Sequence, residues 1–187
     1  MTDHLDLTAY YDTYKKCLLP PQLFEELDQL KNIILKTNKS GGQIFFAGNG
    51  ASAAIASHLA LDLTKQGGVR STTFHDAGLI TAFTNDFGGD NWLSKACDMY
   101  VESTDLVIFI SVSGESPNVV NAARRLRERG IQVGSFTGKK VDNALRGQSD
   151  YSFWVDSNAY NIVECIHMIW LTTVVDMIIG KSEYSVS

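Results

Sequence analysis

Hydrophobic residues recur at helical spacing in two segments near the start of the chain, residues 7–18 and 23–35. Pro20 and Pro21 lie between these segments, and proline is well tolerated in the first turn of a helix. Two glycines at 41–42 end this region. We therefore expect two helices before the first strand.

Beyond these glycines, short apolar runs alternate with segments of helical spacing. Helices are expected over residues 52–65, 117–129 and 162–179. The runs rich in β-forming residues, which predict strands, are 43–47, 72–74, 106–111, 131–136 and 151–155. This alternation is typical of an α/β fold with a five-stranded, mostly parallel sheet and helices on both of its faces.

The helix expected at 162–179 is apolar around most of its circumference, so a membrane span has to be considered. Glu164, His167 and Asp176 interrupt it, and each would be costly in lipid, where a span needs roughly 20 predominantly apolar residues. A helix with so few polar positions is otherwise buried in a core or between subunits. We therefore expect no membrane partner, and the helix favours a homo-oligomer.

The composition is that of one globular domain, with 187 residues, 44% hydrophobic and 20% charged. We treat residues 1–187 as a single domain in which residues 1–40 serve packing and oligomerisation. The net charge of −5, with Lys and Arg scattered, argues against a nucleic-acid partner. The first residues lack the basic and apolar regions of a signal peptide, which predicts a cytoplasmic protein.

The cysteines predict neither a disulfide framework nor a cysteine-built metal site. Cys17, Cys97 and Cys165 are odd in number and far apart in the sequence. We expect them to be small buried hydrophobic side chains.

Two glycine- and serine-rich turns follow expected strands and lead into expected helices, GNGAS at 48–52 and SVSGESPN at 111–118. At the carboxyl end of a parallel strand, the free backbone N–H groups and the dipole of the following helix stabilise an anion. The hydroxyls that could donate to phosphate oxygens are those of Ser52, Ser111, Ser113 and Ser116. Gly48, Gly50 and Gly114 would let the backbone approach closely. The alternative is that these residues are only turn formers and helix caps.

The first turn does not support a nucleotide cofactor. GNGAS does not continue into GxGxxG, because the residue three beyond Gly50 is Ala53, and only a looser variant that ends in alanine survives. The chain contains no GxxxxGK[ST] segment for a nucleoside triphosphate. A Rossmann-type oxidoreductase is further disfavoured by the second serine-rich turn.

Two pairs of ionisable residues share a helix face and could carry chemistry. His58 and Asp62 are four residues apart, a spacing that suits joint metal binding or an acid–base pair. Glu164 and His167 are three apart on the last expected helix and project together. An alternative for this second pair is a buried polar contact that gives specificity between subunits.

With both turns in hand, the sequence resembles the sugar isomerase (SIS) domain family, and within it the phosphoheptose isomerase group. The segments that carry the resemblance are GNGASAAIASHLALDL (48–63), TNDFG (84–88), ISVSGESPNVV (110–120), the TG of FTGK (136–139) and NIVECIHM (161–168). The resemblance implies a three-layer αβα sandwich of the flavodoxin-like kind, a bound phosphosugar and a homotetramer with active sites between subunits.

The resemblance also implies roles for individual residues. The positions that match the substrate-binding residues of the family are Asn49, Ser52, Asp86, Ser111, Ser113 and Ser116, with Gly50 in the same turn. Val112 lies where the family often has threonine, which removes one hydroxyl donor.

In phosphoheptose isomerases, a histidine and a glutamate on the first helix, with a glutamine and a histidine on the last, line the catalytic centre and can hold zinc. His58 matches the first histidine, Asp62 replaces the glutamate, and Glu164 replaces the glutamine. We expect these three residues as ligands if Zn²⁺ is bound. The last histidine of the family is replaced by Thr172, which cannot act as a general base near neutral pH.

Two hypotheses follow from this pattern. The first is an aldose–ketose isomerase of the sedoheptulose 7-phosphate type that works through an enediol, with Asp62, Glu164 or His167 in proton transfer. The second is a phosphosugar-binding sensor or assembly subunit that has lost catalysis together with the histidine.

Overall fold

The computed structural model describes residues 5–184, which form one three-layer domain. The strands are β1 (Ile44–Gly48), β2 (Ser71–Thr73), β3 (Leu106–Ser111), β4 (Gln132–Thr137) and β5 (Tyr151–Trp154). The helices are α1 (Leu7–Leu18), α2 (Leu23–Lys39), α3 (Ala51–Lys65), α4 (Ala77–Phe87), α5 (Trp92–Tyr100), α6 (Pro117–Glu128) and α7 (Tyr160–Ile179), with a short 3₁₀ turn, η1 (Arg146–Gln148).

The five strands form a parallel sheet in the order β2-β1-β3-β4-β5. This is the doubly wound order of flavodoxin-like folds, in which the strand order reverses beside β1 and ligands bind at the carboxyl ends of the strands. β1 and β3 are direct neighbours, and Gly48 at the end of β1 lies opposite Ile110 of β3. The two turns identified in the sequence therefore leave the sheet side by side.

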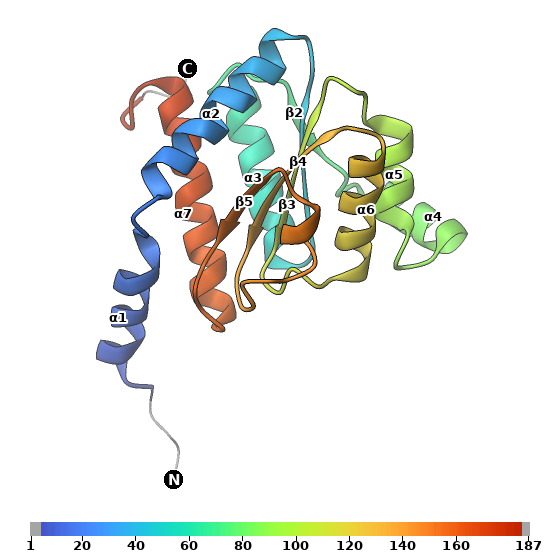
Figure 1. Ribbon diagram of the computed structural model, residues 1–187. Helices are drawn as coiled ribbons and strands as arrows, with labels where there is room; N and C mark the ends of the chain where they lie inside the picture. Colours follow the sequence, from blue (N-terminus) through green and yellow to red (C-terminus); the bar gives the residue numbers. More distant parts are fainter. Residues whose placement is uncertain (1–4, 185–187) are drawn as a thin grey trace.

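Helices cover both faces of the sheet (Figure 1). The layer of α2, α3 and α7 packs on alternate strand residues such as Phe46, Ile108 and Phe136. On the other face, α5 and α6 pack on Phe45, Phe109 and their neighbours. The three-layer α/β sandwich and its five-stranded sheet are confirmed.

Local sequence explains where several helices begin and end. The Asp6 carboxylate caps α1 by accepting from the backbone N–H groups of Thr8 and Ala9. Pro117 occupies the first turn of α6. Gly180 ends α7 in the left-handed conformation, with φ of 84°.

The sequence predictions omitted α4 and α5. α4 does carry apolar residues at helical spacing, Leu79, Ile80 and Phe83, and they are partly buried against the core, so its pattern was present in the sequence. α5 is only 9 residues long, and its apolar positions span too few turns to establish a period.

Among the described residues, α7 is the one helix long and apolar enough to cross a membrane by length and composition. Its apolar residues instead fill the core between the sheet and α2 and α3, including Ile162, Val163, Ile166 and Trp170. The indole N–H of Trp170 donates to the carbonyl of Leu18 and ties the end of α1 to α7. α7 is therefore a core helix, as its ionisable residues indicated.

Candidate active site

The ends of β1 and β3 and the start of α7 enclose a small polar cavity of about 120 Å³. We call it the serine cup. It is lined by Asn49, Ser52, Ser111, Val112, Ser113, Ser116, Tyr160 and Glu164. The structure thus brings together six of the eight residues expected at the substrate, together with one of the expected acid–base residues.

Glycines shape the two turns. A Cβ on Gly48 would lie 2.7 Å from the carbonyl oxygen of Ile110, so β1 and β3 can approach this closely only because position 48 has no side chain. Gly114 has φ of 65°, and a Cβ there would collide with the side chain of Asn143. Gly50, with φ of 56°, caps the start of α3. Its role is conformational, since it is absent from the cup lining.

An amide pair joins the two turns. The side chains of Asn49 and Asn118 donate to each other reciprocally, each N–H···O distance being 3.0 Å. Asn118 is 8% exposed whereas Asn49 is exposed, so loss of this pair would leave the amide of Asn118 without a partner in a mostly buried place, while water could solvate that of Asn49. The pair fixes the spacing of the two halves of the cup.

The cup offers neutral donors to an anion. Ser116 is the N-cap of α6, but its side chain makes no capping bond, so its hydroxyl remains able to donate. Ser111 and Ser113 accept from the backbone N–H groups of Gly114 and Glu115 at 3.2 Å, which leaves their O–H groups free to point at a ligand. Within the described chain, the one charged side chain in the lining is Glu164.

Glu164 lies where two hollows meet. It lines the serine cup and also an open apolar hollow of about 670 Å³ between α3 and α7. The other residues of this α3–α7 groove are Ala51, Ala54, Ile55, His58, Cys165, Met168 and Ile169. The carboxylate is half-buried and can reach a ligand whose phosphate occupies the cup.

His58 and Asp62 form a pair one turn apart on α3, with Nε2 and Oδ2 separated by 3.2 Å. Asp62 lies ten residues beyond Ser52, which is about 15 Å along a helix. It is absent from the lining of the cup, so the structure does not bring it to the expected place of the reacting carbons.

The zinc site expected from the sequence is incomplete in a single chain. His58 and Asp62 offer two donors, and Glu164 lies across the groove from His58. Residues 5–184 contain no group of three His, Cys, Asp or Glu side chains close enough to hold one ion, whereas protein zinc sites use three or four such ligands. The described residues of one chain therefore do not form a complete zinc site. Zinc binding by the protein stays an untested prediction.

His167 and Thr172 both lie away from the cup. His167 is completely buried, and its Nε2 contacts the carbonyl of Thr137 at 3.0 Å. Burial lowers the pKa of His167 to about 4. The expectation that it transfers protons to substrate is corrected, because a neutral, fully enclosed imidazole cannot reach one. The hydroxyl of Thr172 donates to the carbonyl of Met168 in its own helix.

Asp86 is exposed on α4 and is also absent from the cup lining. Its carboxylate accepts a hydrogen bond from the side chain of Asn85 at 2.9 Å. In this arrangement, Asp86 does not contact a ligand bound in the cup of the same chain.

Sequence reasoning missed three residues at the cup. Asn118 lay inside a quoted motif without a role, and Tyr160 precedes Glu164 by one helical turn, a spacing that could have signalled it. His75 reaches the first turn, where its Nε2 accepts from the N–H of Gly48 at 3.4 Å and its Nδ1 lies 3.3 Å from the hydroxyl of Ser57. This contact depends on strand order, which the sequence pattern alone does not contain.

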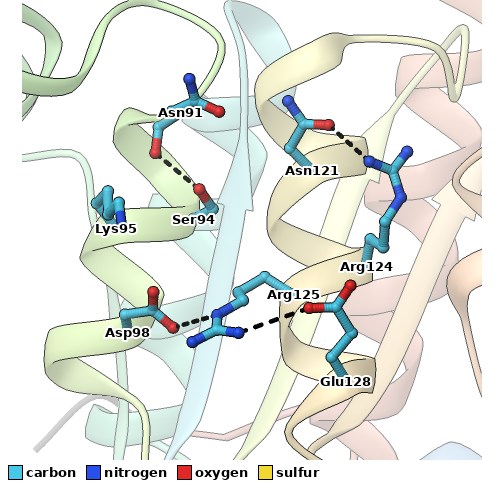
Figure 2. A pocket seen from close by; sticks show the side chains of 8 residues that line it. All are labelled: Asn91, Ser94, Lys95, Asp98, Asn121, Arg124, Arg125 and Glu128. Atoms are coloured by element: carbon cyan, nitrogen blue, oxygen red, sulfur yellow. Dashed lines mark hydrogen bonds and ion pairs between the residues drawn. The ribbon is translucent and has the colours of Figure 1, made fainter.

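A wider hollow of about 540 Å³ lies between α5 and α6 (Figure 2). Arg125 bridges Asp98 at 2.9 Å and Glu128 at 3.5 Å, and Arg124 donates to Asn121. Because most of its charged groups pair with one another, we assign this hollow no ligand.

Comparisons with known proteins give the class. The sequence model of the SIS domain matches residues 9–138, and the chain belongs to the SIS domain family. The phosphoheptose isomerase of Aliarcobacter butzleri is 31% identical over 181 residues, which cover 92% of this chain and 93% of that protein. That of Thermodesulfovibrio yellowstonii is 34% identical over 146 residues, which cover 73% and 72%.

Solved structures agree with this assignment. The phosphoheptose isomerase GmhA from Neisseria gonorrhoeae superimposes with a TM-score of 0.83 at 26% identity and covers 92% of this chain and 97% of its own. A phosphoheptose isomerase from Francisella tularensis gives a TM-score of 0.84 at 22% identity over 97% of this chain and 100% of its own. The second supports the fold alone.

Proposed function

We propose that this protein is a phosphosugar isomerase of the phosphoheptose type, which interconverts sedoheptulose 7-phosphate and an aldoheptose 7-phosphate. One observation carries the proposal: the carboxylate of Glu164 lies in the wall of a cup built from serine hydroxyls and two helix N-termini. The cup suits a phosphate, and the carboxylate suits proton transfer at a nearby carbon. The relatives named phosphoheptose isomerase support the same class of reaction.

The phosphate would be held by hydroxyl and backbone N–H donors at the starts of α3 and α6. The side chains proposed to donate are those of Ser52, Ser111, Ser113 and Ser116, with Val112 contributing only its backbone. Because Glu164 lies in the wall of the same cup and C1 is at the end of the sugar opposite the phosphate, the sugar would bind bent back from the serines, so that C1 reaches the carboxylate.

Glu164 is the proposed base. It would remove the proton from C1 of the ketose while the C2 carbonyl oxygen gains a proton, which gives the enediol. Return of the proton to C2, with loss of the proton on the C1 hydroxyl, completes the aldose. One carboxylate between adjacent carbons can perform both transfers. This route therefore needs neither His167 nor a basic side chain at position 172.

The rival function is a phosphosugar-binding protein without catalysis. The observation that favours it is Thr172, whose hydroxyl is satisfied within its own helix and lies outside the cup lining. The two functions differ in whether hydrogen on carbon exchanges with solvent.

Proton NMR of sedoheptulose 7-phosphate with the purified protein in D2O tests the proposal. We expect deuterium at C1 and new aldose signals with the wild type, and at least a thousandfold slower exchange with Glu164→Gln. The Asp62→Asn variant is the matched control and should retain exchange. Line broadening on binding without exchange by the wild type would favour the rival function.

We propose that zinc is not required for this exchange. His58 and Asp62 can supply two donors, which is too few for tight zinc binding. A chelator should therefore leave the exchange rate unchanged, and added zinc should shift the ring signals of His58 only at high concentration. A rate that falls tenfold with chelator and recovers with zinc would show that other ligands complete the site.

We further propose a homo-oligomer that acts in the cytoplasm. The α3–α7 groove leaves Ile169 43% exposed, and the free end of α1 exposes Leu7 and Tyr11. A second copy that covers such surfaces would remove them from water. The role of α7 as a core helix supports a cytoplasmic location.

A further inference from the structure

The serine cup lacks a positive charge of its own. A phosphate dianion bound there would be close to the carboxylate of Glu164, and like charges at short range oppose binding. Hydroxyls and helix N-termini offset part of this cost. A cation near the mouth of the cup would offset more of it.

The segment that follows β4 adjoins the cup. The N–H of Gly138 donates to the carbonyl of Val112, in the middle of the second turn, at 3.0 Å. A Cβ on Gly138 would lie 2.7 Å from the side chain of Val163 on α7. The backbone at 138–139 is therefore packed between the cup wall and α7, and the residue that follows Gly138 is Lys139.

Lys139 has an unusual backbone. Its φ of 54° makes it the one non-glycine residue with positive φ in the part of the chain that the structure describes. Its N–H donates to Ser157 at 2.9 Å, and its carbonyl accepts from the indole of Trp154 at 3.3 Å. Such a conformation is strained for a residue that has a side chain, and strained backbone clusters at active sites and ligand clamps.

The side chain of Lys139 lies against the cup lining. Its Nζ is 3.9 Å from the centroid of the Tyr160 ring, well within the range of a cation–π contact. Tyr160 is a lining residue of the cup and is 55% exposed. Lys139 forms none of the ion pairs found within residues 5–184, so its charge is available to a ligand.

We propose that Lys139 is the phosphate-recognising cation of this site, held at the mouth of the serine cup by the ring of Tyr160. This inference rests on the proposed function and extends it from the cup itself to the β4–η1 segment. The ammonium group raises affinity for the dianionic phosphate and so selects phosphorylated sugars over free ones. The side chain of Lys139 reaches α7, where its ammonium group lies over the ring of Tyr160.

Isothermal titration with sedoheptulose 7-phosphate and with inorganic phosphate tests this role. Loss of a positive charge close to a bound phosphate removes a Coulomb attraction, and added salt screens that attraction. We expect at least tenfold weaker binding of both probes by Lys139→Met and a smaller loss at 0.5 M salt. Lys139→Arg should bind within threefold of the wild type.

Lys140 provides the matched control, since it is the next residue and is exposed. Lys140→Met should leave both affinities unchanged. Thermal unfolding of each variant separates lost binding from lost folding, and Lys139→Gly, which suits a positive φ, gives a second variant without the charge.

The outcomes distinguish this inference from the proposed function. Wild-type affinity in folded Lys139→Met and Lys139→Gly, with binding intact in the wild type, would overturn the role of Lys139 alone. If the wild type bound neither sedoheptulose 7-phosphate nor inorganic phosphate, both the proposed function and the role of Lys139 would be overturned. Equal losses in Lys139→Arg and Lys139→Met would show that packing rather than charge is responsible, and would also overturn the inference.

Discussion

Two histidines in this chain show how burial sets the chemistry of a side chain. His58 is half-exposed, and its Nε2 lies 3.2 Å from Oδ2 of Asp62. His167 is enclosed between α7 and the end of β4, and its Nδ1 has no partner. The sequence shows only that both residues are histidines, and the difference in their surroundings comes from the structure.

The buried imidazole of His167 predicts a loss of stability in acid. Its pKa is lowered by burial to about 4, below the ordinary value of 6.5. A group whose pKa is lower in the folded state adds stability above 6.5, and this stability is lost as the pH falls from 6.5 to 4. At pH 5 the loss amounts to about 2 kcal/mol.

The variant His167→Phe should remove this loss. A phenyl ring suits the site beside Phe136, whose ring lies 5.9 Å from that of His167, and Thr137 keeps its hydrogen bond from Val155. Urea unfolding at pH 7.5 and 5 measures the difference. We expect the variant to lose about 2 kcal/mol less than the wild type between these values. Parallel losses in both proteins would contradict the assignment.

At the level of elements, the serine cup depends on two neighbouring strands and on the helices that follow them. Parallel pairing of β1 with β3 brings their turns together, and the Asn49–Asn118 amide pair holds them at one distance. Neither turn has the whole set of donors. The serine cup is thus a property of the pair of β–α units.

The amide pair should matter for binding beyond its effect on stability. Asn118→Ala removes both hydrogen bonds and leaves the exposed amide of Asn49 to water, which should destabilise the fold by about 0.5–1.5 kcal/mol. It should also weaken binding of inorganic phosphate by about tenfold. Asn121→Ala, on the same helix but outside the cup, is the control, and phosphate titration with thermal unfolding measures both. Phosphate affinity unchanged in Asn118→Ala would show that the turns hold their spacing without the pair.

At the scale of the whole molecule, the apolar α3–α7 groove beside Glu164 is the surface whose burial would most change the site. A subunit that covers it would exclude water from the carboxylate and from the sugar chain. Ile169 lies on this surface and is 43% exposed. The oligomer and the active site are therefore expected to be coupled.

Ile169→Glu should break the oligomer, because it places a charge in an apolar contact. Light scattering coupled to size-exclusion chromatography measures the mass, and we expect the variant to elute at the monomer mass with tenfold or slower proton exchange. Val141→Glu, at a position that is 57% exposed and outside the groove, should keep the wild-type mass. A wild-type monomer that exchanges protons would contradict the coupling.

The sequence by itself determined the five strands, the long helices and the two glycine- and serine-rich turns. These features depend on local spacing, such as the apolar run at 106–111 and the glycines of GNGAS, and local spacing is visible in one dimension. The family resemblance added the reaction class. α4 was not predicted, although Leu79, Ile80 and Phe83 recur at helical spacing, and the structure shows these side chains partly buried against the core.

Only the tertiary structure decided which ionisable groups face the cup. The packing of Ile162, Val163 and Ile166 on the sheet fixes the rotation of α7 about its axis, and this rotation turns Glu164 outward and His167 inward. The two residues are three apart and share a helix face in the sequence. His167 is buried because it points toward the sheet, and Glu164 lines the serine cup because it points to the other side of α7.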